Sequence, residues 1–276
     1  MNPHTPLSVN PIQMIRSLLI NRQLIVQMTK RDVAGRYKGS VMGLAWSFFN
    51  PVFMLVVYTF VFSEIFKARW GVGGEESKTQ FAVLLFVGLI VLGLVSEVLN
   101  RAPGLIIANV NFVKKVVFPI EILPVIAMGA ALFHGLISLG VLLAAFALFN
   151  GYLQWTVVFI PLVLLPLIIL TTGLAWMLAS LGVFLRDVGQ TVVIITTVLL
   201  FLSPVFYPLT AVPKRFRPII MTNPLTFIIE QAREVLIWGH LPNWMGLGIY
   251  TLAAALVAWA GYAWFQKTRK GFADVL

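Results

Sequence analysis

Residues 36–51 read RYKGSVMGLAWSFFNP, and this stretch decides the fold because two cations, Arg36 and Lys38, come shortly before an apolar segment that begins at Leu44. Lysine and arginine beside the first hydrophobic segment of a membrane protein tend to stay in the cytoplasm, since they are hard to translocate. The junction therefore predicts a membrane protein with a cytoplasmic N-terminus.

The composition also indicates a membrane protein. Of the 276 residues, 59% are hydrophobic and only 11% are charged, and the mean hydropathy is +0.93; soluble domains rarely have such a composition. The net charge of +10 is divided among short segments between the apolar runs. It therefore favours anionic lipid headgroups over nucleic acid as the partner. The absence of cysteine excludes disulfides, thiolate nucleophiles and zinc-thiolate sites.

Six apolar runs are candidates for membrane spans. They cover residues 44–66, 81–99, 122–149, 156–184, 192–206 and 245–265. Because a transmembrane helix uses about 20 residues, we expect an all-α membrane protein with six transmembrane helices and both termini on one side. Placing the N-terminus in the cytoplasm puts 13 of the 20 Lys and Arg residues on the cytoplasmic side, in agreement with the positive-inside rule.

We expect residues 1–43 to form a cytoplasmic interface segment and residues 44–276 to form the membrane domain. From Gln13 to Lys30 the pattern predicts one amphipathic helix lying in the membrane interface. Its apolar half comprises Met14, Ile15, Leu18, Leu19, Ile25, Val26 and Met28. A helix packed against the cytosolic part of the protein is the alternative that the sequence leaves open.

The segment between the fifth and sixth runs has a different character. It contains five prolines within about twenty residues, which excludes one regular helix. Asn223 followed by Pro224 is a typical start of a helix, with an N-cap and a proline at the first helical position. That helix would run through Trp238 to Gly239. We expect short re-entrant helices here, at the outer face, because such broken segments are tolerated at membrane depth only when protein or a wet cavity surrounds them.

Ionisable residues within apolar surroundings are the candidates for chemistry. Glu230 and Glu234 share a helix face, and Arg233 is close enough in sequence to pair with either. A structural ion pair is the first interpretation, and a general acid/base pair is the alternative. His134 lies inside the third run. It is either a functional group of the membrane interior or a neutral histidine hydrogen-bonded to a neighbouring helix.

The sequence predicts no catalytic residue, no metal site and no cofactor bound by the chain itself. It contains no GxxxxGK[ST] motif, so it cannot hydrolyse ATP through a P-loop of its own, and an ATP-driven process would need another subunit. Trp46, Phe49, Phe53 and Phe60 follow helical spacing along one side of the first run. They are either packing or lipid-facing residues, or part of a path for sugars, which stack on aromatic rings.

Several stretches together resemble the permease subunit of ABC-2 type transporters that export polysaccharides, the family of O-antigen, capsule and teichoic-acid exporters, with the greatest likeness to O-antigen permeases. The first of them is the junction: RD at 31–32, RYKGS at 36–40, GLAWS at 43–47 and NP at 50–51. The others are residues 109–119, EILP at 121–124, RDV at 186–188, SPVFYP at 203–208, NPL at 223–225 and FAD at 272–274.

The resemblance implies a homodimeric permease joined to two copies of a nucleotide-binding subunit that holds ATP and magnesium. The complex would move a lipid-linked glycan across the bacterial cytoplasmic (inner) membrane. The small-molecule exporters of the same broad fold and a membrane-embedded prenyl-phosphate sugar transferase are the competing functions.

The resemblance also assigns roles to residues of this sequence. Coupling to the ATPase subunit falls on Asn111, Phe112, Val113, Lys114, Lys115, Arg186 and Asp187, although the first five residues could instead anchor a loop at lipid headgroups. Contacts to the ATPase subunit or to the headgroup at the cytoplasmic entrance fall on Arg31, Asp32, Arg36, Tyr37 and Lys38. The translocation path would contain Trp46, Phe49, Phe53 and Tyr207, and the outer gate Pro224, Glu230, Arg233 and Glu234.

Overall fold

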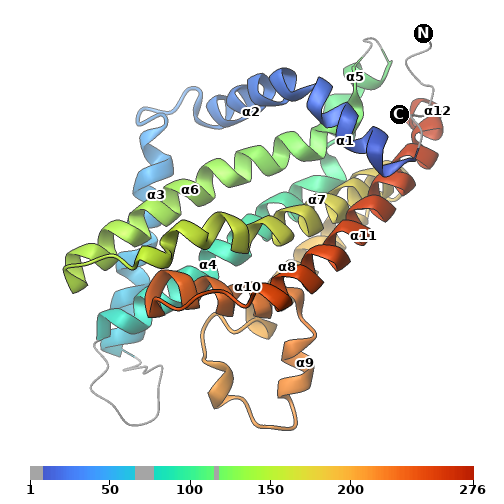
Figure 1. Ribbon diagram of the computed structural model, residues 1–276. Coiled ribbons are helices and arrows are strands. Elements are labelled where there is room, and N and C mark those ends of the chain that lie inside the picture. Colours follow the sequence, from blue (N-terminus) through green and yellow to red (C-terminus); the bar gives the residue numbers. More distant parts are fainter. Residues whose placement is uncertain (1–8, 66–77, 115–117) are drawn as a thin grey trace.

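The computed structural model describes residues 9–65, 78–114 and 118–276 of the chain, and every regular element in these ranges is a helix (Figure 1). The α-helices are α1 (Pro11–Ile20), α2 (Arg22–Tyr37), α3 (Ala45–Tyr58), α4 (Lys78–Arg101), α5 (Val110–Lys114), α6 (Leu123–Asn150), α7 (Ile160–Phe184), α8 (Val188–Leu202), α9 (Arg217–Met221), α10 (Pro224–Arg233), α11 (Trp244–Thr268) and α12 (Phe272–Val275). Short 3-10 helices are η2 (Ala102–Gly104), η3 (Ile107–Asn109), η4 (Ile120–Ile122), η5 (Trp155–Phe159), η6 (Leu209–Ala211) and η8 (Arg269–Gly271), and π-helical turns are η1 (Thr59–Ile65) and η7 (Glu234–Trp238).

Helices α1, α2, α5 and α12 lie at one end of the molecule, which we call the terminal face (Figure 1). Helices α9 and α10 lie at the other end, which we call the opposite face. The long helices α6, α7 and α11 run between the two faces, and α2 lies across the end of the bundle, in contact with α6. This arrangement separates the loops of the protein into two groups.

Five of the predicted spans are confirmed as helices that are long and apolar enough to cross a membrane. They are Ala45–Phe62, Gln80–Gly104, Ile120–Asn150, Trp155–Phe184 and Trp244–Val275. The fifth run differs: its helix, α8, has 15 residues and would be about 22 Å long, less than the roughly 30 Å of a bilayer core. The count of six spans therefore stays a prediction.

The end of α8 has a clear physical cause. The prediction placed this span at residues 192–206, whereas the helix ends at Leu202. Ser203 has extended backbone angles (φ −90°, ψ 148°), which is the conformation that a following proline imposes by steric clash. Pro204 therefore stops the helix before the last four residues of the apolar run.

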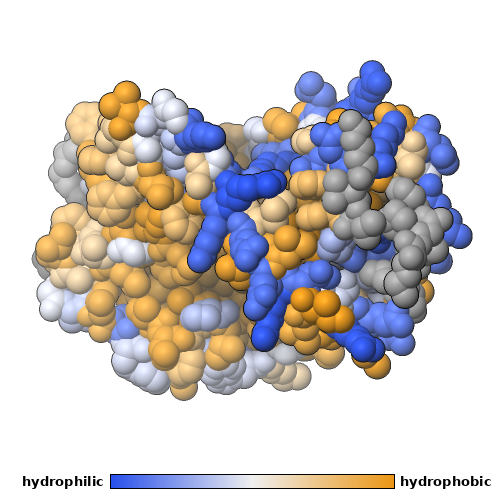
Figure 2. Space-filling model, turned by 90° about the horizontal axis from the view of Figure 1, so that it is seen from above, coloured by the Kyte–Doolittle hydropathy of each residue, from blue (hydrophilic) through white to orange (hydrophobic). Residues whose placement is uncertain are grey.

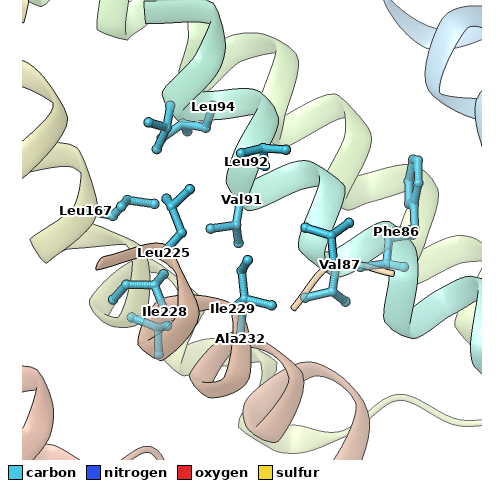
Figure 3. Close-up of a cluster of buried hydrophobic side chains, with 14 of the residues drawn as sticks. Phe86, Val87, Val91, Leu92, Leu94, Leu167, Leu225, Ile228, Ile229 and Ala232 are labelled. Atoms are coloured by element: carbon cyan, nitrogen blue, oxygen red, sulfur yellow. The ribbon is translucent and has the colours of Figure 1, made fainter. Parts of the chain in front are cut away.

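Helix α4 forms the centre of the bundle. It contacts α6, α7, α8 and α10. In the most apolar stretch of this span 72% of the residues are buried, whereas in that of the span containing α3 only 6% are buried. In the main apolar core, Ile229 of α10 points toward Val91 of α4, and Ile228 lies on the side of Leu225 and Leu167 (Figure 3). The short helix α10 is thus buried inside protein, which satisfies the condition for non-spanning helices near a membrane.

Glycines bring α7 and α11 unusually close together. A Cβ atom built on Gly261 would lie 2.0 Å from the backbone oxygen of Gly173, and one on Gly173 would lie 2.5 Å from Cα of Ala258. Only glycine permits this approach, as is common where helices cross inside membranes. The contact holds the last span against the fourth.

The predicted interface helix is two helices in the structure. The break lies at Asn21, whose backbone leaves the helical region and whose side-chain amide donates to the Ser17 carbonyl. Met14 and Leu18 of α1 pack against a second cluster of buried apolar side chains, separate from the main apolar core, whereas Ile15 and Leu19 are exposed. The segment therefore packs on the bundle and also presents apolar side chains outward, so that each of the two interpretations describes part of it. Its separation as a region of its own stays a prediction.

Candidate functional site

The predicted coupling loop forms a short helix on the terminal face. In α5, Val113 is buried while Asn111 and Lys114 are exposed. Phe112 stacks on Phe118, with ring centroids 4.3 Å apart. An apolar anchor with exposed polar residues suits a segment that transmits force to a neighbouring subunit. Lys115 lies outside the described residues.

The second predicted coupling element is the turn at Arg186 and Asp187, which joins α7 to α8. Both residues are exposed, and the Asp187 carbonyl accepts from the Thr191 amide at the start of α8. The C-terminal α12 contacts both α5 and α7. Its Phe272 is fully buried and lies 5.9 Å from the ring of Phe184, two residues before the turn. Helix α12 therefore packs between α5 and the end of α7 that leads into the turn.

A buried polar cluster lies beneath these elements. The Glu121 carboxylate accepts from Arg269 Nη1 at 3.0 Å and from the Ser17 hydroxyl at 3.1 Å, and the Trp176 indole donates to the Glu121 carbonyl at 2.8 Å. The side chains of Glu121 and Arg269 are only 2% and 7% exposed. One carboxylate thus joins α1, the start of α6 and the end of α11, while its backbone joins α7.

A second polar cluster connects α2 to the bundle. Arg36 pairs with Glu97 of α4 at 2.6 Å, and the Tyr37 hydroxyl lies 3.0 Å from Nε2 of His134 in α6. His134 Nδ1 lies 3.2 Å from Glu97. The histidine is therefore hydrogen-bonded between helices, as one of the two sequence interpretations predicted. Burial raises the pKa of the Tyr37 phenol above its ordinary value of 10.0, so it remains a neutral hydrogen-bonding group near pH 7.

The predicted entrance residues do not form one site. Asp32 pairs with Arg101 at 2.8 Å and lies 3.8 Å from Arg36, so the Arg36 guanidinium is shared between two carboxylates. Arg31 and Lys38 are exposed. Viewed from above, the terminal face shows a band of hydrophilic residues across its middle, with hydrophobic surface to the left of it (Figure 2).

A cavity of about 330 Å³ lies between α3, α4 and α6. Its polar lining consists of Asn50, Tyr58, Glu97, His134 and Ser138, and its apolar walls include Met54, Phe86, Leu89, Ile90 and Leu94. Because Glu97 and His134 also hold α2, this cavity is adjacent to the junction between the interface segment and the membrane domain.

The predicted path aromatics of α3 are on the molecular surface. Trp46 and Phe49 are each 48% exposed and Phe53 is 63% exposed, so this stripe faces away from the bundle of its own chain. Tyr207 follows α8, and its hydroxyl donates to the Phe201 carbonyl at 2.9 Å. Within one chain the four side chains do not line a common cavity among the described residues.

The predicted gate residues include a structural ion pair. Arg233 is 1% exposed and pairs with Glu230 at 2.7 Å, and its Nε donates to the Leu84 carbonyl of α4. Glu234 instead pairs with His240. Pro224 is exposed at the start of α10, where the Asn223 side chain accepts from the Leu225 amide. The predicted N-cap and the ion-pair interpretation are both confirmed.

Sequence reasoning missed Glu97, Arg101, Glu121 and Arg269 as members of these clusters. Glu97 carried a usable signal, because an acid within an apolar run needs a partner. Glu121 and Arg269 are separated by 148 positions and each borders an apolar run, so no local pattern relates them.

Sequence comparison with known proteins finds one family model and several relatives. The sequence model of the family described as ABC-2 type transporter matches residues 23–237. The O-antigen export system permease protein RfbA of Myxococcus xanthus is 26% identical over 265 residues, which cover 95% of this chain and 99% of that protein. A protein of the same name from Klebsiella pneumoniae is 27% identical over 255 residues, covering 92% and 95%. The polysialic acid transport protein KpsM of Escherichia coli is 24% identical over 237 residues, covering 86% and 90%.

Proposed function

This chain belongs to the ABC-2 type transporter family, and we propose that it is the membrane subunit of an ATP-driven exporter that moves a lipid-linked polysaccharide of the O-antigen type. The relatives named as O-antigen export permeases align over nearly their whole length, which supports this substrate class. The relative named for polysialic acid transport supports a capsule polysaccharide as the second candidate.

The observation that supports the proposal most directly is the position of the two predicted coupling elements. Helix α12 contacts α5 and also α7, whose end leads into the turn at Arg186, and both coupling elements expose polar residues on the terminal face. A separate ATPase subunit, one for each permease chain, would bind here. Because the chain has no P-loop of its own, ATP and magnesium belong to that subunit.

The orientation follows from charge. On the terminal face the exposed cations include Arg31, Lys38, Lys114, Arg186 and Lys270. The positive-inside rule therefore favours the cytoplasm for this face and for both termini. In a bacterium, the membrane concerned is the inner membrane.

A homodimer would complete the translocation path. Helix α3 is almost entirely unburied within one chain, and its stripe of Trp46, Phe49 and Phe53 needs either lipid or protein as a neighbour. Helix α8 likewise exposes Ile194 and Phe201. Pairing two chains through these helices would place the aromatic stripe, with Tyr207, against a channel for the glycan.

The test is ATP hydrolysis by the permease in complex with its ATPase subunit, with and without lipid-linked polysaccharide. The proposal predicts stimulation by the glycan lipid and none by the lipid carrier alone. Stimulation by a small apolar molecule instead of the glycan would favour the small-molecule exporter. Failure of every candidate ATPase to form a complex would refute the proposal and favour a self-sufficient membrane protein.

A further inference from the structure

A second cavity lies on the opposite face, away from the coupling elements and from the predicted path aromatics. Its volume is about 270 Å³, slightly below the usual range of small-ligand sites, about 300–1,000 Å³. The start of α4, the end of α6, the loop before η5 and the end of η7 surround it. The lining residues are Gln80, Val83, Phe146, Phe149, Asn150, Tyr152, Gln154, Ile237 and Trp238.

The lining combines amides with aromatic rings and contains no charged side chain. Val83, Phe146 and Ile237 are buried and provide an apolar floor. Tyr152 is 55% exposed at the rim. Amide groups offer both donors and acceptors, which matches the adjacent hydroxyl groups of a sugar, and aromatic rings match the apolar C–H face of a pyranose ring. Among the residues that line the cavity, none carries a cation that would attract an anionic ligand.

The amides are positioned before any ligand arrives. The Gln154 side chain donates to the Ile237 carbonyl at 3.2 Å, and the Asn150 side chain donates to the Phe146 carbonyl at 3.0 Å. Among the described residues, no hydrogen bond reaches the side-chain oxygen of either amide. Each oxygen therefore keeps its capacity to accept a hydrogen bond from an incoming hydroxyl group.

The surrounding loops are also fixed. Gly151 and Gly239 have φ of 76° and 73°, which glycine adopts without strain, and the Gln154 amide packs directly on Gly239. The Thr156 hydroxyl donates to the Val235 carbonyl at 2.6 Å, and the Tyr152 ring meets the edge of Phe146 at 5.8 Å. A rigid site of this kind loses little conformational entropy on binding.

We propose that this cavity binds one neutral sugar unit. Only its use as a contact for the exported glycan rests on the proposed function; the recognition itself follows from the lining. A site of a few hydrogen bonds and one stacking ring is expected to bind free monosaccharides with millimolar affinity.

The test is saturation-transfer NMR on the full-length permease in nanodiscs, with D-mannose, D-galactose and N-acetylglucosamine as neutral probes and D-glucuronate as the charged probe. We expect saturation of the ring C–H protons of at least one neutral probe. Tyr152→Ala should weaken this binding about fivefold or more, because a stacking contact contributes about 1 kcal/mol. Tyr152→Phe should retain it. Trp155→Ala is the matched control, since Trp155 is 67% exposed three residues away and does not line the cavity.

Three results would overturn the proposal: no saturation of any neutral probe with folded protein, an effect of Trp155→Ala equal to that of Tyr152→Ala, or tighter binding of glucuronate than of every neutral probe. ATPase stimulation by the glycan lipid is measured separately, on the complex of the same permease variants with the ATPase subunit. If stimulation persists without sugar binding, the cavity proposal fails and the export function stands. If the cavity binds sugar but no ATPase subunit forms a complex with the permease, the cavity proposal stands and the export function fails.

Discussion

Removing the Arg269 side chain should strongly destabilise the protein, because it leaves a buried carboxylate without its cationic partner. In Arg269→Gln, Glu121 keeps the Ser17 hydroxyl as a donor but loses the guanidinium at 3.0 Å. Both side chains of the pair are less than a tenth exposed. Breaking such a buried pair from one side costs about 3–5 kcal/mol, so the free energy of unfolding should fall by that amount.

The double variant Glu121→Gln/Arg269→Gln removes both charges and should recover at least about 2 kcal/mol relative to Arg269→Gln, since no charge is then left buried and unpaired. Lys267→Gln is the control: it deletes an exposed cation of α11 two residues before Arg269, and it should change stability by less than about 0.5 kcal/mol.

The assay is equilibrium unfolding in mixed micelles with increasing dodecyl sulfate, followed by tryptophan fluorescence and far-UV circular dichroism. Trp176 donates to the Glu121 carbonyl and so reports on this cluster directly. If Arg269→Gln is no less stable than Lys267→Gln, or if the double variant is less stable than Arg269→Gln, the reasoning about this buried pair is wrong.

Three further predictions concern packing, capping and coupling. Gly261→Ala should lower the free energy of unfolding by about 1–3 kcal/mol, because its Cβ would lie 2.0 Å from a backbone oxygen of α7. Gly248→Ala in the same helix meets nothing within 4 Å and should raise the free energy of unfolding by up to about 1 kcal/mol. Unfolding midpoints distinguish the two variants, and equal effects would contradict the close crossing. Asn223→Ala should lower the free energy of unfolding by about 1 kcal/mol, because it removes the N-cap of α10; an unchanged value in the same assay would show that the cap is dispensable. Neutralising Lys114 and Lys115 together should abolish glycan-stimulated ATP hydrolysis and leave assembly of the proposed dimer intact, as measured by ATPase rates and light scattering. Unchanged stimulation would remove α5 from the coupling role.

Hydrophobic length and local capping were readable from the sequence because both are local properties. The runs at residues 81–99 and 245–265 became α4 and most of α11, and Asn223 caps α10 as predicted. Pro204 explains where prediction failed for α8: hydropathy continued to Phe206, but the backbone before a proline left the helix. Asn21 similarly divided the predicted interface helix in two.

Contacts between distant segments could not be predicted in this way. The Arg36–Glu97 pair and the Glu121–Arg269 pair join helices whose relative positions depend on packing of the whole bundle. The cavity at Tyr152 likewise depends on four segments meeting at one corner. The path aromatics of α3 were identified by spacing, yet one chain leaves them exposed, and only the proposed dimer would place them against a channel.

The most direct measurement of the central claim is glycan translocation in proteoliposomes that contain the permease and its ATPase subunit, with lipid-linked polysaccharide confined to the leaflet that faces the ATPase. A membrane-impermeant glycosidase in the opposite compartment would detect the glycan that has crossed. The export account predicts that glycan becomes cleavable only with ATP and magnesium, and not when Lys114 and Lys115 are neutralised. Appearance of glycan at the same rate without ATP, or none in complexes that hydrolyse ATP in response to it, would contradict the account.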